Sequence, residues 1–96
     1  MYEARYHPKI KKDLKKIAPP IREKIRTEHI PKILSDPGAG GKLSGDLNGT
    51  CSYHFKIAGQ QFRIAYIADE QTKTVFVQMI AKRGEFYVLL KRRIRG

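Results

Sequence analysis

Five side chains between residues 54 and 87 have the chemistry to act together on a phosphate group: His54, Lys56, Arg63, Arg83 and Tyr87. RNA can be cut without a metal ion if its own 2′-hydroxyl attacks the adjacent phosphorus. That reaction needs a base for the hydroxyl, cations for the charge that builds on the phosphoryl oxygens, and an acid for the leaving 5′ oxygen. The sequence contains residue types for each of these functions.

Each residue type suits a different role. His54 has an ordinary pKa of about 6.5 and can exchange a proton at neutral pH, and Lys56 is the alternative base. Arg63 and Arg83 offer bidentate donors to a phosphate, while Tyr87 offers a stacking face for an unpaired base. The residues alone leave the choice between His54 and Lys56 open.

A hairpin of two strands is expected to bring these residues together. Residues 51–57 alternate apolar and polar side chains, and a second strand is expected from about Phe62 to Ala68. Because a type II′ turn takes glycine first, the predicted turn is Gly59-Gln60. That turn places Lys56 directly opposite Arg63.

The same register gives the hairpin one apolar face. Six side chains are expected to be buried there, in the pairs Ile57 with Phe62, Phe55 with Ile64, and Tyr53 with Tyr66. On the polar face, two opposed cations repel, and folding alone does not favour them. An anion between Lys56 and Arg63 would relieve the repulsion, so this conflict indicates a functional site.

The rest of the chain predicts a single α+β domain over residues 1–96. A helical hairpin is expected to pack on one face of a mostly antiparallel sheet of about four strands, and Pro31 is expected to kink or split the second helix near Ile30. The predicted elements are a strand over 2–6, helices over 9–17 and 21–34, a loop over 35–41, a strand over 74–80 and a short C-terminal helix over 86–94.

The charge of the chain favours a polyanionic partner. A net charge of +11 over 96 residues attracts nucleic acid first. Four further cations are candidates for binding RNA: Lys42, Lys82, Lys91 and Arg92. Cys51 is the single cysteine, which excludes an internal disulfide and a multi-cysteine zinc site. It lies on the apolar face and is expected to be a small buried hydrophobe.

Several classes of protein are not expected. No cluster of carboxylates is present to hold magnesium, so neither a metal nor a cofactor is predicted. The first residues lack the apolar run of a signal peptide. No segment approaches the roughly 18 apolar residues of a membrane span. A cytoplasmic location without a membrane partner is expected.

Three motifs, in this order, resemble the RelE/ParE toxin superfamily, the small basic toxins of toxin–antitoxin pairs. K-L-S-G-D-L-N-G at 42–49 is similar to the family's K-L-x-G-x-L-x-G run. F-R-I-A-Y at 62–66 is similar to its Y-R-[IV]-x-Y strand, and K-R-G-E-F-Y at 82–87 to its R-x-x-[VI]-Y ending. The resemblance spans nearly the whole chain and implies a RelE-like fold.

The resemblance also implies roles for particular residues. Lys56 matches a family lysine assigned as general base, Arg63 and Arg83 match the phosphate and transition-state arginines, and Tyr87 matches the tyrosine that orients the nucleotide. His54 stands where well-studied members have another lysine, which again leaves the base open between His54 and Lys56.

The superfamily has two functional classes. RelE-like members are mRNA endonucleases that act in the ribosomal A site, whereas ParE-like members inhibit DNA gyrase without the nuclease residues. We predict the first: an endoribonuclease toxin whose partners are a cognate antitoxin and mRNA in the ribosomal A site. The alternatives are a gyrase inhibitor and a simple basic nucleic-acid-binding module. The nuclease hypothesis requires His54, Lys56, Arg63 and Arg83 to share one open face.

Overall fold

The computed structural model describes residues 1–95, apart from the side chain of Asp46. Its five strands form one sheet in the order β1-β5-β4-β3-β2. The strands are β1 (Glu3–Tyr6), β2 (Gly41–Lys42), β3 (Cys51–Ile57), β4 (Gln60–Asp69) and β5 (Thr74–Lys82). β1 is parallel to β5, and the other neighbouring strands are antiparallel. The predicted α+β class is confirmed. The extra strand, β2, is too short to show an alternating pattern in the sequence.

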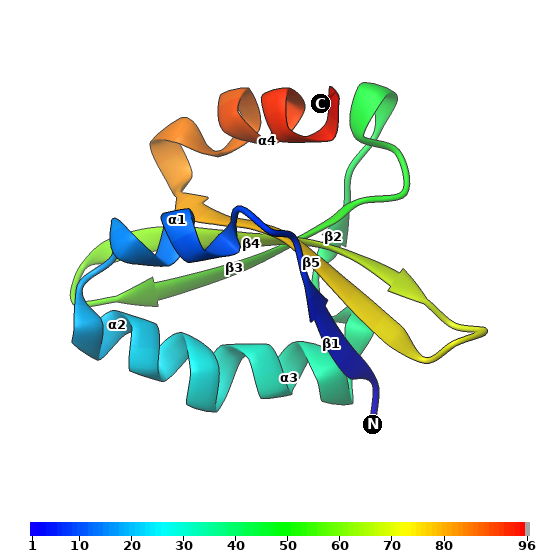
Figure 1. The fold of residues 1–96 in the computed structure, drawn as a ribbon, viewed down its shortest axis with the longest axis horizontal. Coiled ribbons are helices and arrows are strands. Elements are labelled where there is room, and N and C mark those ends of the chain that lie inside the picture. Colours follow the sequence, from blue (N-terminus) through cyan, green and yellow to red (C-terminus); the bar gives the residue numbers. More distant parts are fainter. Residues whose placement is uncertain (96) are drawn as a thin grey trace.

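The helices lie on both sides of this sheet. They are α1 (Ile10–Lys15), α2 (Pro19–Lys24), α3 (Ile30–Ser35) and α4 (Phe86–Arg95). Figure 1 shows α2 and α3 beneath the sheet and α4 above it, which makes three layers. Within residues 1–95, no helix has the length and apolar character needed to cross a membrane.

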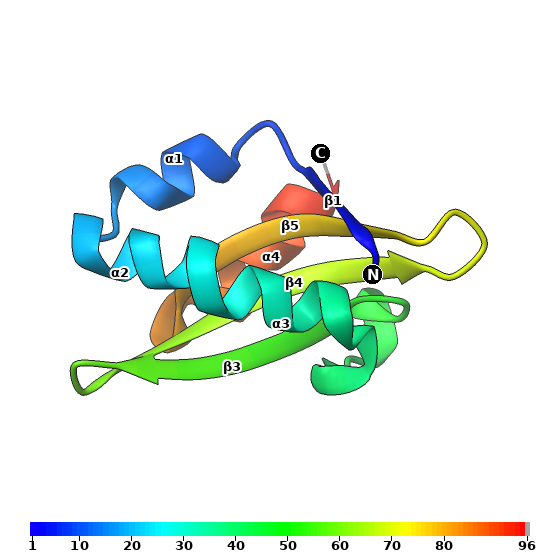
Figure 2. The same cartoon turned by 90° about the horizontal axis from the view of Figure 1, so that it is seen from below.

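One helical rod runs from α2 through α3, because a π-helical turn over Ile25–His29 joins them. Pro31 has no N–H to donate, which predicted a kink or a break near Ile30. Instead, the Ile30 N–H donates to the Ile25 carbonyl, and the wider turn lets the helix continue through the proline. Figure 2 shows this rod crossing the sheet diagonally.

The main core lies between the helices and the sheet. Tyr53, Phe55, Phe62, Ile64 and Tyr66 are all buried there, as predicted, whereas Ile57 is half-buried. The rings of Phe55 and Phe62 stack with their centroids 5.4 Å apart. Isoleucines of the helical segments complete this core: Ile10, Ile17, Ile25, Ile30 and Ile33. Cys51 packs against it but is only half-buried.

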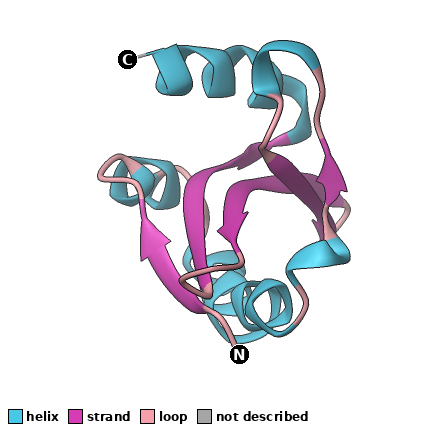
Figure 3. Ribbon diagram, turned by 90° about the vertical axis from the view of Figure 1, so that its right-hand side faces the viewer, coloured by secondary structure: helices cyan, strands magenta, loops and turns pink. Residues whose placement is uncertain are grey.

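A second, smaller core lies on the opposite face of the sheet, which the sequence had indicated to be polar. α4 lies over this face (Figure 3), and its Phe86 and Leu90 are fully buried. They pack with Ala65 of β4, Met79 of β5 and Leu47. This core explains why the sequence of β5 is almost continuously apolar, since both of its faces are covered.

The turn between β3 and β4 differs from the predicted Gly59-Gln60 turn. Ile57 pairs with Gln60, so the two turn residues are Ala58 and Gly59, with φ angles of 53° and 80°. Positive φ at both positions is the pattern of a type I′ turn, which matches the twist of the strands. Residues other than glycine rarely adopt a positive φ, so the backbone conformation of Ala58 is unusual.

This turn shifts the strand register by two residues. Arg63 lies opposite His54, and Lys56 lies opposite Gln61. The predicted pairing of Lys56 with Arg63 is therefore wrong. Because side chains alternate with a period of two, a shift of two residues keeps every side chain on its predicted face. His54 and Lys56 are accordingly exposed.

Candidate active site

His54 and Arg63 form the centre of the candidate site. They are directly opposite each other on β3 and β4, on the face of the sheet that carries α4. Their neighbours in sequence, Tyr53 and Phe62, point into the main core, so the alternation directs His54 and Arg63 to the other side. His54 is exposed and Arg63 is half-buried, which leaves both accessible to a ligand.

The start of α4 holds the Arg63 side chain. Arg63 Nη1 donates a hydrogen bond to the Tyr87 hydroxyl at 2.5 Å. The guanidinium carbon lies 5.2 Å from the centre of the Tyr87 ring and 5.7 Å from that of Phe86. Since Phe86 is fully buried, it is a fixed platform for the guanidinium. Arg63 is thus oriented by a packed helix.

Arg83 reaches the same face from the turn that follows β5. Its Nη1 donates to Gln61 Oε1 at 3.1 Å. Gln61 is opposite Lys56, and its side chain lies on the same face as that of Arg63, two residues along β4. The structure therefore places His54, Lys56, Arg63 and Arg83 on one face, in the half of the β3–β4 hairpin that is nearer its turn.

The imidazole of His54 lies in a positively charged environment. Partial burial, together with the charges of Arg63 and Arg83, lowers the pKa of His54 from its ordinary value. The three groups are therefore close enough to interact electrostatically. A lowered pKa keeps the imidazole neutral at neutral pH, which is the form that accepts a proton.

An open pocket of about 550 Å³ lies beside this cluster, between α4 and residues 42–47. Two of the four further cations, Lys42 and Lys91, line it together with Tyr87. Arg92 is exposed on α4 but does not line the pocket. Lys82 pairs with Phe62 across the strands, and a directly opposed pair shares a face. Lys82 thus lies on the other side of the sheet from His54.

Two contributors to the site had no signal in the sequence. Gln61 orients Arg83, yet a glutamine beside a turn resembles any exposed polar residue. Phe86 was indistinguishable from an ordinary apolar residue of the C-terminal helix. Among residues 1–95, no three His, Cys, Asp or Glu side chains gather in a group that could hold a metal ion.

Comparisons with known proteins identify the family and the fold of the chain. Residues 5–91 match the family model described as the ParE-like toxin of type II bacterial toxin–antitoxin systems. Curated proteins give no significant sequence match. Among solved structures, the toxin–antitoxin complex RelBE2 from Mycobacterium tuberculosis is 25% identical, with a TM-score of 0.73 over 85% of this chain and 98% of that one.

Two E. coli structures share the fold at lower identity. The isolated E. coli RelE toxin is 24% identical, with a TM-score of 0.66 over 98% of this chain and 99% of that one. The toxin in the intact E. coli RelBE toxin–antitoxin complex is 18% identical, with a TM-score of 0.67 over 85% of this chain and 96% of that one. These similarities show that the fold is RelE-like.

Proposed function

The chain belongs to the ParE-like toxin family of type II toxin–antitoxin systems, within the RelE/ParE superfamily, and from this premise we propose that it is a ribosome-dependent mRNA endonuclease. Cleavage would proceed in the ribosomal A site by metal-independent attack of a 2′-hydroxyl. The proposed catalytic residues are His54, Lys56, Arg63, Arg83 and Tyr87.

One observation supports this proposal most strongly: His54 lies opposite Arg63 on an exposed face, and partial burial together with the charges of Arg63 and Arg83 lowers its pKa. Like charges on one face repel each other, which opposes folding unless an anion compensates them. A phosphate bound between the arginines would compensate their charges and bring its 2′ side to the imidazole. The same anion that relieves the repulsion is thus the group at which RNA is cut.

The geometry supports a stepwise assignment. His54 Nε2 or Nδ1 takes the proton of the 2′-hydroxyl, and the resulting oxygen attacks the adjacent phosphorus. Arg63 and Arg83 neutralise the charge that develops on the phosphoryl oxygens. The bond between phosphorus and the 5′ oxygen then breaks, and the Lys56 ammonium supplies the proton that this oxygen needs. The products are a 2′,3′-cyclic phosphate and a 5′-hydroxyl.

The pocket beside the cluster suits the RNA around the cut. The Tyr87 ring is half-exposed and offers a stacking surface for one base. Lys42 and Lys91 lie where the backbone of a neighbouring nucleotide would pass. Lys82 and Arg92 are proposed as more distant contacts, because neither lies in this pocket.

The pH dependence of cleavage separates the two candidate bases. If His54 is the base, the rate should rise with pH and reach its plateau at a pH below the ordinary histidine pKa of about 6.5, because partial burial and the charges of Arg63 and Arg83 lower the pKa of His54. His54→Gln should remove this rise. If Lys56 is the base instead, the rate of the wild type should continue to rise well past neutrality, and His54→Gln should retain that dependence.

The overall test uses purified protein with translating ribosomes, followed by mapping of the mRNA ends. Cleaved mRNA with 5′-hydroxyl ends, in the wild type but not in Arg83→Gln, is the expected result. Intact mRNA would contradict the nuclease proposal. Lys15→Gln is a control that removes one exposed positive charge from α1.

Inhibition of DNA gyrase is the second candidate function, because the matching family model is the ParE-like one. It predicts that the protein blocks DNA supercoiling while mRNA on ribosomes stays intact. A third candidate, a simple basic nucleic-acid-binding module, predicts binding without either effect. The same purified protein can be tested in all three assays.

We also propose that a cognate antitoxin binds this chain. The RelBE2 and RelBE structures with the same fold are toxin–antitoxin complexes. The net charge of +11 makes an acidic partner favourable. Co-expression with the protein encoded next to this gene, followed by co-purification, tests the partnership.

A further inference from the structure

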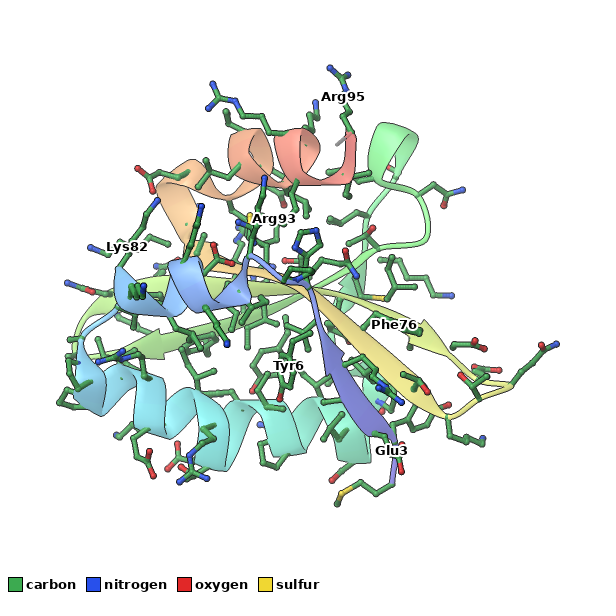
Figure 4. All side chains as sticks on the ribbon, viewed as in Figure 1. Glu3, Tyr6, Phe76, Lys82, Arg93 and Arg95 are labelled. Carbon is green, nitrogen blue, oxygen red and sulfur yellow. The ribbon has the colours of Figure 1, made fainter. Side chains whose placement is uncertain are left out.

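A largely buried ion pair connects α1 to α4. Arg93 Nη2 donates to Asp13 Oδ1 at 2.9 Å, and Arg93 Nη1 donates to Asp13 Oδ2 at 2.5 Å. The two side chains are only 12% and 10% exposed. Figure 4 shows Arg93 extending from α4 toward α1. Such bidentate pairing fixes the orientation of both side chains.

The same two side chains are bonded to the backbone of β5. The Ile80 N–H donates to Asp13 Oδ2 at 3.1 Å, and Arg93 Nη1 donates to the Gln78 carbonyl at 3.1 Å. Gln78 lies at an irregularity of the β4–β5 pairing, between the paired residues Val77 and Met79. The ion pair therefore joins α1, α4 and the sheet at one point.

Arg93 and Tyr87 lie on different sides of α4. Phe86 and Leu90 form the stripe that packs on the sheet, and Arg93 continues this stripe on the side toward α1. Tyr87 and Lys91 face residues 42–47 instead. At 3.6 residues per turn, the directions of Arg93 and Tyr87 differ by about 120° around the helix axis. A contact that fixes Arg93 thus limits the rotation of α4 about its own axis. It thereby also fixes the position of Tyr87.

We propose that Asp13 and Arg93 are positioning residues, whose ion pair fixes the rotation of α4 over the sheet and thereby holds the Tyr87 hydroxyl beside Arg63. Phe86, Leu90 and the partly buried Leu89 attach the helix to the sheet through apolar packing, which has little directional preference. The bidentate pair supplies the second point of attachment. Neither residue touches the cluster around His54, so both act through Tyr87.

The first measurement needs no enzymatic activity. In Arg93→Gln, amide hydrogen exchange in the second half of α4 should be at least about tenfold faster than in the wild type, while β4 is unchanged. The NMR signal of the Tyr87 ring should also shift, and Tyr87→Phe identifies that signal. Lys15→Gln, which removes one positive charge from the exposed surface of α1, should change neither. Wild-type exchange and an unshifted ring signal in Arg93→Gln would overturn the proposal.

The second measurement rests on the proposed nuclease function and asks whether the pair acts through Tyr87. Arg93→Gln should lower single-turnover cleavage about tenfold in the wild-type background but less than about twofold in Tyr87→Phe, because coupled residues are not additive. Equal losses in both backgrounds would make the pair a general stabiliser and overturn the positioning role. If the wild type cleaves no RNA, the function fails, and the exchange and ring measurements still decide the inference.

Arg93→Gln leaves the Asp13 carboxylate largely buried without its partner, which can prevent folding. Two conservative variants keep the test usable in that case. Arg93→Lys keeps the charge but loses the bidentate geometry, and Asp13→Asn keeps the shape but loses the charge. Both should show the same faster exchange and ring shift to a smaller degree. Wild-type values in both variants would overturn the proposal.

Discussion

Replacement of Arg63 by glutamine should separate catalysis from folding. In the folded protein, Arg63 donates one hydrogen bond to Tyr87 and lies against the rings of Phe86 and Tyr87. The hydrogen bond contributes about 0.5–1.5 kcal/mol, and each contact of the cation with a ring about 0.5–1 kcal/mol. Because the change also relieves repulsion from Arg83, Arg63→Gln should lower the free energy of unfolding by about 1–3 kcal/mol.

The proposed reaction should depend on Arg63 more strongly than the fold does. Removing one donor to a developing oxyanion costs about 2–4 kcal/mol in the transition state. That cost corresponds to a decrease of about 30- to 900-fold in the cleavage rate. A domain with the ordinary stability of about 5–15 kcal/mol stays folded after the loss estimated above. The variant should therefore be folded and nearly inactive.

The assay measures single-turnover mRNA cleavage on translating ribosomes and urea unfolding on the same preparations. Arg5→Gln is the matched control, because it removes the same charge from an exposed position on the edge strand β1. The control should cleave within about twofold of the wild type. A wild-type rate in Arg63→Gln would refute the reasoning. So would an equal loss in Arg5→Gln, because net charge would then explain the effect.

Three further predictions concern the fold and the partner. Tyr66→Phe removes the buried hydroxyl that accepts from the Gly40 N–H at 2.9 Å and donates to the Pro37 carbonyl at 2.5 Å. The free energy of unfolding measured in urea should therefore fall by about 1–3 kcal/mol. An unchanged free energy of unfolding would contradict the importance of these bonds. Acidification below about pH 6.5 should lower the melting temperature, because burial and nearby lysines lower the pKa of His29 and the unfolded chain then binds more protons. His29→Gln should weaken the dependence of the melting temperature on pH. An identical dependence in both proteins would show that other groups cause it. Antitoxin affinity, measured by calorimetry, should fall between about 50 mM and 500 mM salt, and equal affinities would exclude an electrostatic contribution.

The sequence predicted the strands and their faces better than their register. Alternation identified Tyr53, Phe55, Phe62, Ile64 and Tyr66 as core residues, and all are buried. Both registers place Tyr53 and Phe55 opposite apolar or aromatic side chains, so the alternating pattern could not distinguish them. The turn decided the register, because Ala58 adopts a positive φ, which is rare for alanine and which no pattern in the sequence predicts. The stacking of Phe55 on Phe62 stabilises the observed pairing.

The candidate site was predictable only in part, for a similar reason. Residue type and strand alternation were enough to place His54, Lys56 and Arg63 on one face. Their partners depend on three-dimensional contacts that leave no local pattern. Gln61 meets Arg83 only because of the shifted register, and Tyr87 meets Arg63 only because α4 folds back over the sheet. The predicted opposition of Lys56 and Arg63 is wrong, because Arg63 lies opposite His54 and Lys56 opposite Gln61.

The parallel pairing of β1 with β5 also determines when this protein can be complete during its own synthesis. Glu3 pairs with Thr74, so the chain must be made at least as far as residue 74 before β1 can pair with β5. Contacts this distant in sequence form late, because a long loop must close first. The segment that carries Tyr87 and orients Arg63 is made later still. Until α4 has been made and has folded back over the sheet, Arg63 lacks the Tyr87 hydroxyl that orients it, so the candidate site is assembled only after the sheet.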